Sequence, residues 1–77
     1  NSVNIGGELQ EYLTALRQIV ETIEDAKQKR DASEILDSVE SQLALPKPSK
    51  TVVSVLLSAL PHIASISSLA SAIIGAL

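Results

Sequence analysis

Apolar residues recur every three or four positions over the first third of the chain, which is the spacing of an amphipathic helix. The residues that share this spacing are Leu9, Tyr12, Leu13, Leu16, Ile19, Val20, Ile23 and Ala26. The stripe is wider than the two columns of a coiled coil, so it favours packing inside a globular helical domain. We predict one helix over about 7–30, with the basic residues of 27–30 in its last turn, where cations complement the helix dipole.

A second amphipathic segment follows, and we predict a second helix over 32–45. Asp31 and Glu34 have the spacing of a capping box, in which the first side chain accepts from the backbone and the second reaches back. The apolar positions of this segment are Ile35, Leu36, Val39 and Leu43. Pro46 ends the helix, because proline has no N–H to donate and restricts the residue before it. Whether the two segments form separate helices or one bent helix stays open from the sequence.

A proline-rich connector over 46–50 separates this amphipathic half from an apolar half over 51–77. We predict a helix over 52–60, after which Pro61 either kinks that helix or precedes a fourth helix over about 62–76. The predicted fold is all-α. It is a single domain spanning all 77 residues, a small antiparallel bundle of three to four helices whose last helix pair is kinked at the proline.

Charge divides the chain at the connector. All nine acidic residues and four of the six basic ones precede it, Lys47 and Lys50 lie within it, and residues 51–77 carry no formal charge. The net charge of −3 argues against a nucleic-acid partner, whose phosphates require clustered Lys and Arg. Tyr12 is the one aromatic residue, so the chain also lacks a stacking platform for single-stranded bases.

Candidate catalytic chemistry is sparse. The sequence has no cysteine, which excludes disulfides, thiolate metal sites and cysteine nucleophiles. His62 is the single histidine, and the nearest acidic residues in the sequence lie beyond the connector, so no carboxylate is positioned to orient it. We therefore expect a protein that is not an enzyme, with no catalytic residue, no metal and no cofactor.

The apolar half has two competing interpretations. It is long enough to cross a bilayer and has no formal charge, which would suit a membrane-active or membrane-anchoring helical peptide formed by residues 51–77. Against this stand six serines, the Pro61-His62 pair and the absence of an aromatic belt. The amphipathic half also needs an apolar partner, and residues 51–77 are the available one. We favour a bundle with a cytoplasmic location, and keep membrane association as the alternative.

A segment that is hydrophobic nearly all round requires cover on all sides, which a chain this short does not supply by itself. We therefore expect a non-catalytic protein–protein association or oligomerisation module, a fragment of a larger protein. It would form a homo-oligomer or dock on other domains of that parent. The expected contact residues are Leu56, Leu60, Ile63, Ile66, Leu69 and Ile73.

The order of elements resembles a family of bacterial modules. An amphipathic stretch over 9–19 (LQEYLTALRQI) is followed by a helix that begins with acidic residues, a PKP connector over 46–48, and an Ala/Ser/Leu-rich tail that ends at 72–77 (AIIGAL). This resembles the small C-terminal helical modules of bacterial multidomain proteins, including pentapeptide-type and NTPase-type signalling or defence proteins. The resemblance implies an association module at the end of a longer polypeptide, and it transfers no active-site residue.

Overall fold

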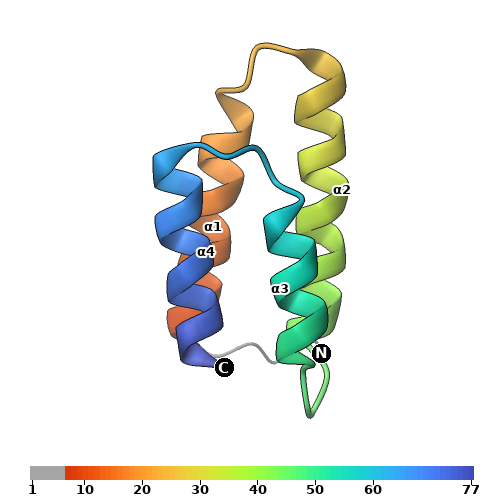
Figure 1. Ribbon diagram of the computed structural model, residues 1–77, viewed down its shortest axis with the longest axis vertical. Coiled ribbons are helices and arrows are strands. Elements are labelled where there is room, and N and C mark those ends of the chain that lie inside the picture. Colours follow the sequence, from red (N-terminus) through yellow and green to blue (C-terminus); the bar gives the residue numbers. More distant parts are fainter. Residues whose placement is uncertain (1–6) are drawn as a thin grey trace.

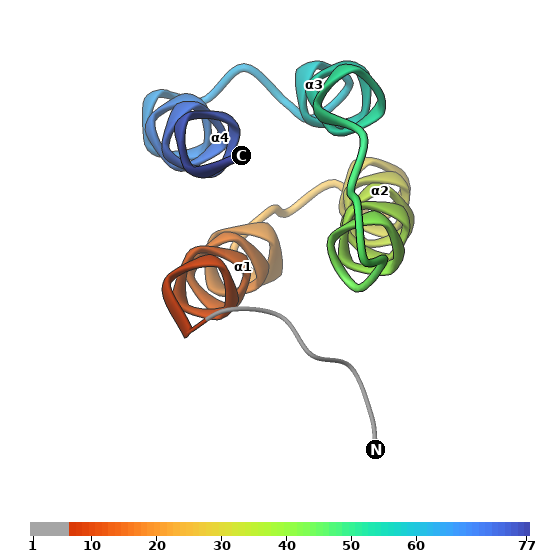
Figure 2. The same ribbon diagram turned by 90° about the horizontal axis from the view of Figure 1, so that it is seen from below.

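Four helices run alternately up and down in the computed structural model, which describes residues 7–77 (Figure 1). They are α1 (Gly7–Glu21), α2 (Ala26–Leu43), α3 (Lys50–Ser58) and α4 (Ala64–Ala76). Each helix packs against two neighbours: α1 contacts α2 and α4, and α3 contacts the same two helices. Seen end-on, the helices stand at the corners of a square, with α1 and α2 in one layer and α3 and α4 in the other (Figure 2). The predicted all-α antiparallel bundle is confirmed.

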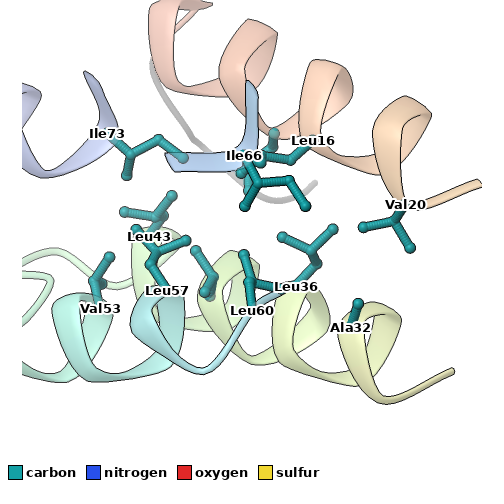
Figure 3. Close-up of a cluster of buried hydrophobic side chains, with 12 residues drawn as sticks. Leu16, Val20, Ala32, Leu36, Leu43, Val53, Leu57, Leu60, Ile66 and Ile73 are labelled. Carbon is teal, nitrogen blue, oxygen red and sulfur yellow. The ribbon is translucent and has the colours of Figure 1, made fainter. Parts of the chain in front are cut away.

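The core lies along the axis of the bundle and receives side chains from all four helices (Figure 3). The buried residues are Leu13, Leu16, Val20, Ala32, Leu36, Val39, Leu43, Val53, Leu57, Leu60, Ile66 and Ile73. Within residues 7–77 every buried residue is hydrophobic. Each fully buried Leu, Ile or Val contributes about 1.5–3 kcal/mol relative to an exposed position, so aliphatic packing is the main stabilising contribution of the core.

The break between the first two helices falls earlier than the sequence pattern predicts. α1 ends at Glu21, nine residues before the predicted end of the first helix, and α2 begins at Ala26. Thr22 closes α1, because its backbone N–H and its hydroxyl both donate to the carbonyl of Ile19, at 3.0 and 2.6 Å. Asp25 then caps α2 by accepting from the backbone N–H of Lys27 at 3.1 Å. The two helices are separate.

Helical geometry explains this earlier break. With about 100° of rotation per residue, the buried positions of α2 would lie roughly two fifths of a turn away from those of α1 if the helix continued. A continuous helix could not place both sets in one core, so the chain must reset its register between them. The predicted capping box is therefore wrong, since Asp31 lies within α2 and pairs with Lys27 at 3.7 Å.

The basic run over 27–30 consequently lies in the first turns of α2 and not in the last turn of the first helix. Cations at this end of a helix oppose the dipole. Nearby carboxylates offset this effect: Lys29 pairs with Glu21 across the turn at 3.2 Å, and Lys27 pairs with Asp31. Both pairs are exposed, so each contributes at most about 1 kcal/mol.

The connector spans residues 44–49 in the structure, where the sequence pattern predicts 46–50. α2 ends at Leu43, ahead of Pro46, and α3 begins at Lys50, within the predicted connector. Ser49 caps α3, with its hydroxyl oxygen accepting from the backbone N–H of Val52 at 3.2 Å. The backbone N–H of Ser49 donates to the Gln42 side chain at 3.4 Å, which ties the connector back to α2.

At Pro61 the chain reverses its direction, so the break separates two antiparallel helices and is not a bend within one pair (Figure 1). α3 ends at Ser58, and the backbone N–H groups of Ala59 and Leu60 close its last turn. Leu60 is buried and so fixes the reversal to the core. The predicted fourth helix forms as α4, which begins at Ala64, directly after Ile63.

Candidate association surface

The charged and uncharged residues of the chain occupy different layers of the bundle. All the ion pairs found within residues 7–77 lie in the α1–α2 layer or the turn that joins its helices. Lys50, at the first position of α3, is the one charged side chain on α3 and α4. The fold therefore converts a division along the sequence into a division in space, with one layer charged and the other nearly free of charge (Figure 2).

Arg17 forms ion pairs that link the two helices of the charged layer. Its guanidinium donates to Asp37 Oδ1 at 2.9 Å and to Glu40 Oε1 at 3.1 Å, and these bonds join α1 to α2. Burial lowers the pKa of Arg17, but the hydrogen bond to Asp37 and the charges of Glu40 and Asp37 outweigh it, so the pKa lies above its ordinary value. Arg17 on α1 is thus paired with two carboxylates of α2 within the charged layer.

The six predicted contact residues fall into two groups. Leu60, Ile66 and Ile73 are buried in the core of the same chain, so we leave them out of the candidate surface. The remaining three are Leu56 and Leu69, which are half-buried, and Ile63, which is 41% exposed. All six were predicted from their hydrophobicity, but their position around the helix decides which of them face solvent. In α4 the buried residues Ile66 and Ile73 lie seven positions apart, on the side that faces α1 and α3.

Two exposed valines on the outer face of α3 are not among the six predicted contact residues. Val55 is 63% exposed and Val52 is 41% exposed, although both are large β-branched hydrophobic residues. Their positions are offset from Val53 and Leu57, the buried pair of the same helix. That offset was the available signal, because residues 53, 57 and 60 share one helical face and residues 52 and 55 do not.

The outer face of α4 has the opposite character. Every exposed residue of α4 is alanine, serine or glycine: Ala64, Ser65, Ser67, Ser68, Ser71, Gly75 and Ala76. A Cβ atom added at Gly75 would have no heavy atom from another part of the chain within 4 Å, so open space lies over this end of the helix. Small residues allow another helix to approach closely. The uncharged layer therefore presents one helix with exposed valines beside one helix with short side chains.

An open groove of about 410 Å³ runs between these two helices. Its lining includes Ser54 and Ser58 from α3 and Ser67 and Ser71 from α4, above the buried side chain of Leu57. Residues 54–58 of α3 and 67–71 of α4 thus border the same groove. No carboxylate or basic side chain of Lys or Arg lines the groove.

His62 lies at one end of the groove, where it meets the end of α3. Its Nε2 is 3.3 Å from the backbone carbonyl oxygen of Ser58, and the Ser58 hydroxyl donates to the carbonyl of Val55 at 2.9 Å. Both side chains thus contact helix backbone, and neither is paired with a carboxylate. Within residues 7–77 no cluster of three or more His, Asp or Glu side chains is placed to hold a metal ion.

None of the helices formed by residues 7–77 combines the length and the apolar character that spanning a membrane requires. The uncharged half forms two short helices, α3 of nine residues and α4 of thirteen.

No family model, curated protein or solved structure matches the chain. The resemblance to C-terminal helical modules of bacterial multidomain proteins stays a prediction.

Proposed function

We propose that this protein is a non-catalytic association module whose contact surface is the outer face of the α3–α4 layer. One observation carries the proposal: apolar Val52, Val55 and Ile63 are exposed on a layer where Lys50 is the one charged residue of the two helices. The centres of protein interfaces are depleted in charged residues. A layer that is uncharged and partly apolar is expected to be covered in the working state of the protein.

A charge placed on this surface tests the proposal. Val55→Lys introduces an ammonium group at the most exposed of the large hydrophobic residues. Without a partner in the contact, this group costs about 2 kcal/mol or more, which raises the dissociation constant by about 30-fold or more. Gln18→Lys is the matched control, because Gln18 is exposed on α1 and the substitution changes the net charge equally.

The measurement is light scattering of the purified chains over a range of concentrations, with circular dichroism to verify that each variant keeps its helices. We expect the natural chain and Gln18→Lys to form the same discrete assembly, and Val55→Lys to scatter as a single chain. A natural chain that stays single at every concentration contradicts the proposal. Co-sedimentation of single chains with neutral lipid vesicles would also contradict it and would favour membrane association.

A further inference from the structure

Polar side-chain bonds tie three of the four helices together and do not involve the fourth. Arg17 joins α1 to α2 through Asp37 and Glu40. The side chain of Gln42 on α2 accepts from the backbone N–H of Ser49, the residue that caps α3. Within residues 7–77, every ion pair and every hydrogen bond of a side chain is formed by residues outside α4. Apolar packing is therefore what holds α4 in the bundle.

The packing of α4 is less extensive than that of the two long helices. Two of its thirteen side chains, Ile66 and Ile73, are buried, compared with three in α1 and four in α2. On the side of α3 the contact is interrupted by the open groove of about 410 Å³. Side chains that border such a space lack partner atoms on one side and lose the corresponding dispersion energy. Removing α4 from the bundle thus exposes less buried apolar surface of its own than removing α1 or α2 would.

The local sequence of α4 also contributes little to its stability as a helix. Four serines, three isoleucines and one glycine make up eight of its thirteen residues, and these types are poorer helix formers than alanine or leucine. Ile63 at the N-cap position forms no side-chain cap bond, whereas Asp25 and Ser49 cap α2 and α3. An isolated helix of this length is marginal in water. α4 should therefore unwind once it leaves its neighbours.

We propose that α4 opens as a unit, so that it detaches and unwinds while α1, α2 and α3 stay folded. Proteins open in such cooperative units at a lower free energy than global unfolding requires. A single connection, the turn over 59–63, joins α4 to the other described helices, so its release does not require them to separate. This inference does not rest on the proposed association.

Release of α4 changes the apolar surface of the protein. Leu57 and Leu60 of α3 line the groove together with Ile66 and Ile74 of α4. Both leucines are buried in the closed bundle, and they lose this cover when α4 leaves. The fold thus has a closed state and an open state, and the open state presents apolar side chains that the closed state hides.

Hydrogen exchange of the backbone amides under native conditions tests the proposal. The measurement uses NMR on dilute protein, so that association does not protect α4, and each rate is compared with the intrinsic rate of its residue. In the natural chain we expect the amides of 68–74 in α4 to be protected about ten-fold less, or weaker still, than those of 32–42 in α2. Equal protection in the two helices would overturn the proposal, because it would show that α4 opens only with the whole bundle.

Two matched substitutions separate local opening from global unfolding. Ala72 on α4 and Ala15 on α1 are both half-buried and lie within their helices, so glycine at either position weakens its own helix by a similar amount. Ala72→Gly should speed exchange in α4 by about five-fold. Ala15→Gly should speed exchange in α2 by about five-fold and leave exchange in α4 unchanged, because α1 stays folded when α4 opens.

Circular dichroism verifies that both variants keep their helices. An equal acceleration of α4 exchange by the two substitutions would overturn the proposal, since a helix that exchanges only through global unfolding responds to a weakened α1 as much as to a weakened α4. If either variant fails to fold, the comparison of α4 with α2 in the natural chain decides the question without it.

Discussion

At the scale of single residues, the pKa of Tyr12 depends on a carboxylate of the charged layer. Tyr12 is half-buried beside the core, one helical turn after Glu8. The charge of Glu8 raises the pKa of the Tyr12 hydroxyl above its ordinary value of 10.0, and partial burial raises it further. The folded chain therefore holds this proton more tightly than the unfolded chain. The fold loses stability as the pH rises from 10.0 through the raised pKa, and no loss from this group occurs below 10.0.

Because Tyr12 is the one aromatic residue, tyrosinate absorbance follows this group alone. We expect the absorbance midpoint of the folded chain to lie above 10.0, and Glu8→Gln to move it downwards. Glu34→Gln, on the outer side of α2, is the control and should leave the midpoint unchanged. A midpoint at or below 10.0 in the natural chain would show that Glu8 does not act on the hydroxyl.

The candidate surface shows what sequence can and cannot predict about single residues. Periodicity correctly predicted apolar helices over the last third of the chain. It groups Leu60 with Val53 and Leu57 and sets Val55 apart, but it does not tell which group is buried, because apolar residues lie on all sides of this segment. That difference depends on which side of α3 meets α2 and α4, and this is a property of the assembled bundle.

At the scale of elements, the local sequence signals for the start of α2 disagree with the start that the structure shows. The Asp31–Glu34 spacing and the basic run both favoured a helix start near residue 32, yet the structure begins α2 at Ala26. The decisive requirement is that the apolar faces of α1 and α2 enter one core. A change of register along the chain therefore predicts a helix boundary better than a short capping pattern does.

Two matched substitutions test this boundary. Asp25→Ala removes the side chain that caps α2, and we expect it to lower the free energy of unfolding by about 1 kcal/mol. Asp31→Ala should cost only a few tenths of a kcal/mol, because Asp31 makes one exposed ion pair in the second turn. Urea denaturation measures both. If Asp31→Ala proves the more destabilising, the first helix break lies where the sequence pattern placed it.

At the scale of the whole molecule, the fold separates charge from apolar surface. Four short helices bury an aliphatic core, hold the acidic residues in the α1–α2 layer, and leave the α3–α4 layer nearly uncharged. Association through that layer would bury apolar surface and no ion pair. It should therefore persist when salt screens charges, and it should strengthen as the repulsion between two chains of net charge −3 declines.

Sedimentation equilibrium of the natural chain, over a range of concentrations at low and high salt, tests this account most directly. We predict a mass that rises with concentration above 8.1 kDa, with as much assembly or more at high salt. A mass that stays at 8.1 kDa throughout, or an assembly that salt dissociates, would contradict association through the uncharged layer.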